Sequence, residues 1–191
     1  MEKERAFQQF TKILREATSR IEHEYFLLPV AGSKDAIYRE RVYCYELYHI
    51  LREAFEESRF PYSLAGEVDK NGHSIIYPKV GAKKPDLIIH VPGRMDKNLV
   101  VIEVKPIKSD TEETKKDLKT LIGFLAEANY FRAIHLVYGG CENEIKKYIE
   151  RSFKREQIEF KDSLFLFWHN APGRMAKILN WTELVRNISD E

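Results

Sequence analysis

The chain has 191 residues, of which 43% are hydrophobic and 32% are charged, and its formal net charge is +1. This length suits one domain with a substantial core, and the hydrophobic content excludes a disordered chain. No apolar run reaches the roughly 20 residues that a membrane helix needs, and Cys44 and Cys141 show no pairing or metal-ligand spacing, so we expect a cytoplasmic protein without membrane contact.

Apolar spacing along the chain predicts two helices first, over residues 3–25 and 36–57. Three strands follow, and after them helices alternate with strands to the end of the sequence. The expected strands are residues 63–68, 83–91, 98–105, 133–140 and 163–170, and the expected later helices are residues 111–129, 141–157 and 174–187. This order predicts an α/β fold in which a mixed sheet of about five strands is flanked by helices, with an added N-terminal helix.

The strand LVVIEVK, residues 99–105, contains charged side chains that a buried strand normally lacks. Because side chains alternate along a strand, Val101, Glu103 and Lys105 share one face, whereas the opposite face is wholly apolar. Both faces begin with apolar residues, which is typical of a central strand rather than an edge strand. The charges appear only at the carboxyl end of the strand, where burying them costs free energy unless they have partners.

Pairing this strand with the one before it brings a second carboxylate to the same place. A hairpin with a loop over residues 92–97 sets Asp86 opposite Glu103. Cross-strand neighbours have Cβ atoms roughly 4.5–5.5 Å apart, so the two carboxylates could share one divalent cation. Lys105 offsets one of the two negative charges, and a hard cation such as Mg²⁺, which prefers oxygen ligands, would offset the rest.

These residues, Pro85-Asp86 on one strand and Glu103-Val104-Lys105 on the next, resemble the motif of the PD-(D/E)xK nuclease superfamily, whose fold is called restriction-endonuclease-like. The expected elements over residues 36–140 match the α-β-β-β-α-β core of that family. The resemblance implies that Asp86 and Glu103 bind Mg²⁺, for which Mn²⁺ substitutes, and that Lys105 positions the attacking water. It also implies one nuclease-like domain over residues 1–191, with an N-terminal helical extension over 1–30, the catalytic core over 36–140 and a C-terminal helix-strand-helix over 141–191.

In that family a glutamate from the preceding helix often completes the site, and the helix over residues 36–57 offers Glu40 and Glu46. The aromatic neighbours of Glu46, in the sequence YELY, favour Glu46 as the catalytic residue and third metal ligand. Glu40 remains the alternative, because the helix dipole favours a carboxylate near the start of a helix. Glu67, on the first expected strand, could face the same site.

Positive charge gathers around the motif, because residues 70–119 contain 11 Lys and Arg against 7 Asp and Glu. Such an excess favours a local surface that faces phosphate groups. The lysines expected to contact nucleic acid are Lys108, Lys115, Lys116 and Lys119. An ordinary solvated surface explains the same charges equally well.

The resemblance implies a metal-dependent endonuclease that hydrolyses phosphodiester bonds, and the precedent of the superfamily favours DNA over RNA. Its usual contexts are bacterial or phage nucleic-acid processing and defence. Specificity would come from loops, from a partner protein or from the structure of the DNA, and cleavage of two strands would be easiest for a homodimer. Two alternatives remain open: a catalytically inactive nucleic-acid-binding module, and a structural protein in which Glu103 and Lys105 form a plain ion pair.

Overall fold

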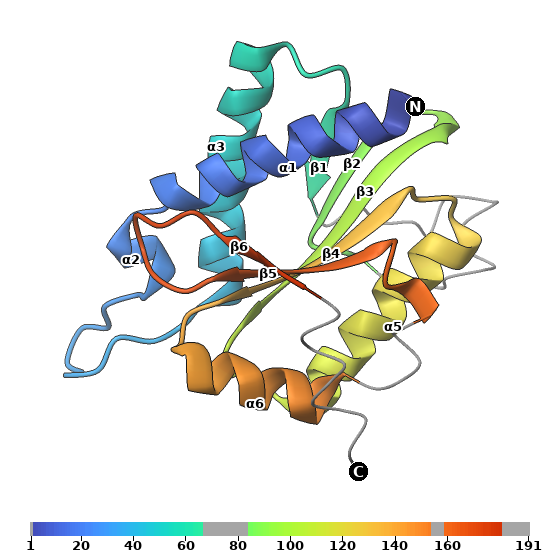
Figure 1. Cartoon of the computed structure of the whole chain (residues 1–191). Coiled ribbons are helices and arrows are strands. Elements are labelled where there is room, and N and C mark those ends of the chain that lie inside the picture. Colours follow the sequence, from blue (N-terminus) through green and yellow to red (C-terminus); the bar gives the residue numbers. More distant parts are fainter. Residues whose placement is uncertain (1, 67–83, 154–158, 181–191) are drawn as a thin grey trace.

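The computed structural model describes residues 2–66, 84–153 and 159–180 of the chain (Figure 1). Its helices are α1 (Glu2–Arg20), α2 (His23–Phe26), α3 (Glu40–Ser58), α5 (Thr111–Glu127) and α6 (Glu142–Ser152). Its strands are β1 (Ser63–Gly66), β2 (Leu87–Val91), β3 (Arg94–Pro106), β4 (Arg132–Tyr138), β5 (Leu164–His169) and β6 (Lys177–Leu179). The protein is therefore α/β, as predicted. Among the described residues, none of the helices has the length and apolar character of a membrane span.

The strands form one mixed sheet of six strands, in which the spatial order follows the chain order from β1 to β6. The pairs β1–β2, β2–β3 and β5–β6 are antiparallel, whereas β3–β4 and β4–β5 are parallel. Helix α5 connects β3 to β4, and helix α6 connects β4 to β5. Two parallel neighbouring strands need such a crossover connection. The expected number of about five strands is one too few.

The additional strand, β6, lies where the sequence predicts a helix over residues 174–187. Residues Lys177–Leu179 instead pair antiparallel with β5, with Ile178 opposite Phe167. This pairing gives hydrogen-bond partners to backbone groups along the outer edge of β5, which would otherwise be exposed. The helix prediction is wrong for residues 177–179, and residues 181–187 lie outside the described residues.

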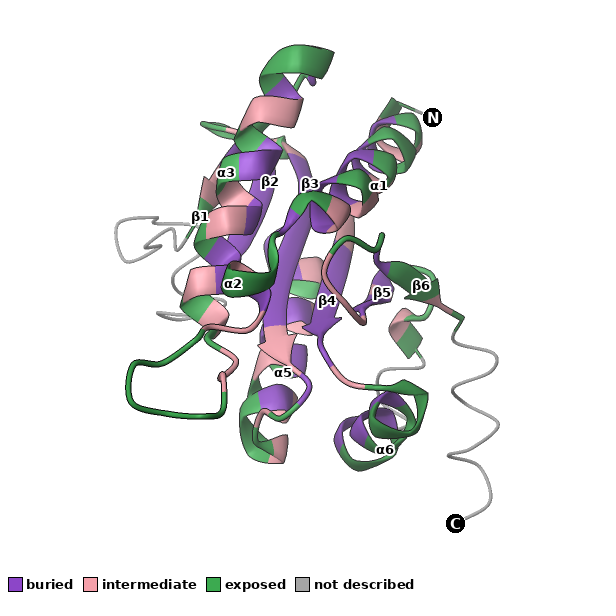
Figure 2. Cartoon of the chain, turned by 90° about the vertical axis from the view of Figure 1, so that its left-hand side faces the viewer, coloured by how far each residue is buried: buried purple, intermediate pink, exposed green. Residues whose placement is uncertain are grey.

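Helices cover both faces of the sheet. Helices α1, α2 and α3 pack on one face, and α5 and α6 pack on the other (Figure 1). Alternate residues of β3 serve the two sides: Val100, Ile102 and Val104 join the core under α1 and α3, whereas Val101 joins the core under α5 and α6. The central strands are buried on both sides (Figure 2). The position of β3 in the middle of the sheet agrees with the sequence prediction for it.

Helix α3 begins four residues later than the sequence predicts. The backbone of Ile37 exchanges two hydrogen bonds with that of Leu28, with N···O distances of 2.9 and 2.8 Å. This bridge holds the chain before the helix in an extended conformation, so the first helical residue is Glu40. The consequence is that a carboxylate stands in the first turn of α3, at the end that lies beside β3.

The hairpin of β2 and β3 has the predicted register over most of its length. Leu87 lies opposite Ile102, and the next two pairs follow the same register. The turn differs from the expected loop over residues 92–97, because β3 already begins at Arg94 and a bulge follows in the ladder. Gly93 has a φ of 77°, a left-handed conformation that favours glycine and that closes the chain tightly. The change is confined to the turn and leaves the other end of the hairpin as predicted.

Candidate functional site

Asp86 immediately precedes β2, at the end of the hairpin remote from the turn. Its Oδ2 accepts a hydrogen bond from the backbone N–H of Val104 at 2.7 Å. This bond holds the Asp86 carboxylate against β3, next to the paired residues Leu87 and Ile102. Asp86 therefore lies beside Glu103, as the sequence predicts. Burial raises the pKa of Asp86 to about 6, although the Val104 N–H works in the opposite direction.

Glu103 lies inside β3 and is only 5% exposed. Burial raises its pKa well above the usual range, and the neighbouring charges of Asp86 and Asp117 raise it further. The carboxyl groups of Asp86 and Glu103 lie close enough for each to influence the pKa of the other. Two adjacent carboxylates cannot both ionise at low cost, so the pair must hold either a proton or a cation.

Lys105 lies two residues beyond Glu103 on the same face of β3, with 11% of its side chain exposed. Its Nζ is 2.7 Å from Glu40 Oε2 and 3.2 Å from Asp117 Oδ2. Burial works to lower the pKa of Lys105, but the hydrogen bond with Glu40 and the charges of Asp117 and Glu40 outweigh it, and the pKa rises. The lysine is therefore a stable ammonium group that donates hydrogen bonds.

The structure brings Glu40, and not Glu46, into contact with Lys105. Glu40 reaches Lys105 from the first turn of α3, whereas Glu46 lies more than a helical turn further along and is partly exposed. Among the described residues, no hydrogen bond or ion pair links Glu46 to Asp86, Glu103 or Lys105. The alternative, Glu40, is thus the helix glutamate in contact with the motif, and the preference for Glu46 stays a prediction. Glu67 lies outside the described residues.

Asp117 is the member of the cluster that the sequence analysis missed. It lies on α5, where its carboxylate forms an ion pair with Lys105 and is mostly shielded from solvent. Burial raises its pKa, and the charge of Lys105 partly counteracts the effect. A signal was available, because Asp117 occupies the helical stripe of the buried residues Thr114 and Leu121. A carboxylate in such a stripe needs a partner from another element.

The cluster consists of four carboxyl groups and one ammonium group, those of Asp86, Glu103, Glu40, Asp117 and Lys105. Its acidic groups therefore outnumber its single ammonium group. Within the described ranges, no three His, Cys, Asp or Glu side chains already surround one point as a metal cluster would require. Mg²⁺, however, is commonly held by one or two carboxylates with water completing its shell. Asp86 and Glu103 supply such a pair of oxygen donors, and their raised pKa values mark the place where a cation would relieve the repulsion. The donor set fits Mg²⁺ or Mn²⁺.

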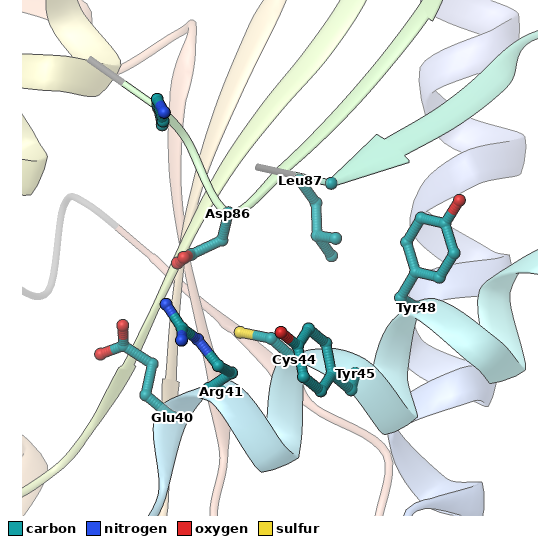
Figure 3. A pocket seen from close by; sticks show the side chains of 9 residues that line it. Glu40, Arg41, Cys44, Tyr45, Tyr48, Asp86 and Leu87 are labelled. Atoms are coloured by element: carbon teal, nitrogen blue, oxygen red, sulfur yellow. The ribbon is translucent and has the colours of Figure 1, made fainter. Parts of the chain in front are cut away.

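Two hollows adjoin the cluster, and residues in the first turns of α3 line both of them. The first has a volume of about 560 Å³ and the second of about 630 Å³. Asp86 lines the first hollow, whereas Lys105 and Asp117 line the second. Figure 3 shows the first hollow, where the carboxyl groups of Glu40 and Asp86 and the guanidinium of Arg41 point toward one another. A ligand could therefore reach the cluster from either hollow.

The four lysines expected to contact nucleic acid have different surroundings. Lys116 lines the second hollow beside Lys105. Lys115 forms an ion pair with Glu112 at 2.7 Å, and Lys108 Nζ lies 6.0 Å from the centre of the Tyr38 ring. Lys119 is exposed one turn further along α5. Of these lysines, only Lys116 lines a hollow next to the candidate site.

Comparison of the chain with protein-family models, with curated proteins and with solved structures finds no match.

Proposed function

We propose that the protein is a metal-dependent nuclease that hydrolyses phosphodiester bonds. The observation that carries the proposal is the convergence of three elements: Asp86 and Glu103 are adjacent at the end of the hairpin, and Lys105 pairs with Glu40 from the preceding helix. A helix glutamate next to a strand-borne D…ExK set is the arrangement that the PD-(D/E)xK resemblance implies. Family precedent favours DNA as the substrate.

The order of elements supports the same proposal. From α3 to β4 the chain runs helix, three antiparallel strands, helix and parallel strand, as in the restriction-endonuclease-like core. Helices α1 and α2 precede this core, and α6, β5 and β6 follow it. We therefore propose that the protein has this fold with additions at both ends.

In the proposed chemistry Asp86 and Glu103 hold Mg²⁺, which when bound lowers the pKa of a coordinated water and stabilises charge on the phosphoryl oxygens. The Val104 N–H fixes the orientation of the Asp86 carboxylate. Lys105 has a raised pKa and stays protonated at neutral pH, so it cannot accept the proton of the attacking water. We assign it to orienting that water and to stabilising developing negative charge, with Glu40 and Asp117 holding the ammonium in place.

A structural role is the second candidate, because Lys105 already has two carboxylate partners. In that case Glu40, Lys105 and Asp117 would only join α3, β3 and α5, and the protein would bind nucleic acid without cleaving it or not bind it at all. In this alternative the adjacent Asp86 and Glu103 would share a proton, because two ionised carboxylates at that place repel each other.

The test is a cleavage assay with single-stranded, duplex and branched DNA and RNA, each in Mg²⁺, in Mn²⁺ and in EDTA. We expect wild-type protein to cleave at least one substrate only when metal is present, and Asp86→Ala to cleave none. Melting temperatures recorded with and without metal report binding independently of turnover. Failure of wild-type protein to cleave any substrate, together with a melting temperature that ignores both metals, would favour the structural role.

A further inference from the structure

Tyr45 is exposed in a way that its neighbours are not. Tyr45 is 61% exposed, whereas Tyr43 and Phe55 on the same helix are buried, with exposed fractions of 0% and 6%. Among the large hydrophobic residues that are exposed in the described part of the chain, Tyr45 is the sole aromatic one. An aromatic ring open to solvent beside a candidate catalytic centre is a surface on which a flat ligand can stack.

The two hollows meet at this tyrosine. Glu40, Arg41 and Tyr45 line both of them, so the hollows are neighbours across the first two turns of α3. Each volume lies within the range of sites that hold small organic ligands, roughly 300–1,000 Å³. Each of the two hollows, which we call the α3 groove, therefore provides room for a nucleotide, and Glu40 and Lys105 both line the second.

Basic side chains accompany the ring along the α3 groove. Lys84 and Arg41 line the first hollow, and Arg39 and Lys116 line the second. A row of cations next to an aromatic surface is the combination with which proteins hold single strands, the cations following the phosphates and the ring stacking on a base. An intact duplex keeps its base faces stacked on one another, so it cannot offer one to Tyr45.

We propose that the α3 groove binds an unpaired nucleic-acid strand, with one base stacked on Tyr45 and the adjoining phosphate directed to Lys105 and Lys116. This inference rests on the proposed function for the identity of the ligand and deepens it by naming the substrate class. The stacked base selects single-stranded or locally unpaired DNA or RNA over a perfect duplex. Tyr45 is thus a positioning residue, which fixes the position of the bound strand without touching the reacting atoms.

The test is fluorescence anisotropy in EDTA with labelled oligonucleotides of about 12 nucleotides, a length within known single-strand site sizes. Single-stranded DNA, single-stranded RNA and a DNA duplex of the same sequence form three arms. The variants are Tyr45→Ala, Tyr45→Phe, which keeps the ring, and Met175→Ala, an exposed control in the loop before β6 at the far edge of the sheet. Melting temperatures establish that each variant is folded.

We expect wild-type protein to bind a single strand more tightly than the duplex. Tyr45→Ala should weaken single-strand binding about 5–150-fold, the equivalent of one lost stacking contact. Tyr45→Phe and Met175→Ala should bind as wild type does, and the comparison of DNA with RNA identifies the strand. Equal single-strand affinity of Tyr45→Ala and wild type, tighter binding of the duplex, or absence of binding in all three arms would overturn the inference.

This measurement involves neither metal nor turnover, so its outcome is separate from that of the nuclease proposal. Tyr45-dependent binding by a protein that cleaves nothing would contradict the nuclease and leave this inference standing. Metal-dependent cleavage, together with a single-strand affinity that Tyr45→Ala leaves unchanged, would support the nuclease and overturn this inference.

Discussion

The Lys105 ammonium lies 2.7 Å from the Glu40 carboxylate, which comes from a helix 65 residues earlier in the chain. This contact joins the first turn of α3 to the carboxyl end of β3, where Glu103 and the adjacent Asp86 also lie. The contact thereby joins α3 to the hairpin of β2 and β3 in one charged cluster, which adjoins two hollows.

Replacing Glu40 by Gln should reduce cleavage strongly, because the neutral amide no longer fixes the Lys105 ammonium by charge. We expect a loss on the order of 10²-fold in the single-turnover rate, the lower end of the effect of a misplaced catalytic donor. Glu46→Gln is the matched control on the same helix, and its rate should stay close to that of wild type. A larger loss in Glu46→Gln than in Glu40→Gln would reverse the assignment of the helix glutamate.

Replacing Lys105 by Met should abolish detectable cleavage, with a rate loss on the order of 10²–10⁴. The same variant should be less stable in EDTA by roughly 1–3 kcal/mol, because the shielded Asp117 carboxylate and Glu40 lose their cation. Urea unfolding in EDTA and in Mg²⁺ measures this loss beside the cleavage assay. Wild-type cleavage by Lys105→Met would remove the lysine from the mechanism.

Replacing Asp86 by Asn should raise the melting temperature at about pH 7.5 in EDTA. The folded-state pKa of Asp86 is raised from 3.8 to about 6, so the folded protein binds this proton more tightly than the unfolded chain does. The ionised carboxylate therefore costs stability above about pH 6, and this cost disappears as the pH falls toward 4. Asn removes the charge and can still accept the hydrogen bond from Val104.

The advantage of Asp86→Asn should accordingly shrink between about pH 6 and pH 4. Added Mg²⁺ should raise the melting temperature of wild type more than that of the variant, since the variant lacks one of the two oxygen anions that hold the cation. An Asp86→Asn protein that melts below wild type at pH 7.5 in EDTA would show that the ionised carboxylate is already compensated.

Replacing Lys116 by Ala should lower the salt dependence of nucleic-acid binding. If this lysine meets one phosphate from the second hollow, the slope of log K against log salt should fall by about 0.7 for a single strand. Lys119→Ala, an exposed lysine on the same helix, is the control and should leave the slope unchanged. Equal effects of the two substitutions would indicate a diffuse surface charge and no defined path past the site.

The strand part of the site could be predicted from the sequence because strand geometry is local. Alternation places Glu103 and Lys105 on one face of β3, and counting outward along the hairpin places Asp86 beside Glu103, even though the turn itself was wrong. The register survived because one face of each strand must be buried, and a slip by one residue would turn the charges into the core. The register shifts lie on either side of His90, near the turn, and do not reach the end of the hairpin at Asp86.

The helical part could not be predicted in the same way. Whether Glu40 or Glu46 meets Lys105 depends on where α3 begins and on how it lies across the sheet, and the start of α3 is set by the backbone bridge between Leu28 and Ile37. That bridge leaves no periodic signal in the sequence. Asp117 could have been suspected from its place in the buried stripe of α5, but its partner comes from β3 and becomes visible only in the folded chain.

The most direct test of the central claim is the anomalous scattering of crystals soaked in Mn²⁺. The proposed centre predicts a manganese peak in contact with carboxylate oxygens of both Asp86 and Glu103, with Lys105 nearby but not coordinating. A map in which no neighbouring molecule blocks the hollow beside Asp86 and no manganese lies beside either carboxylate would contradict the claim.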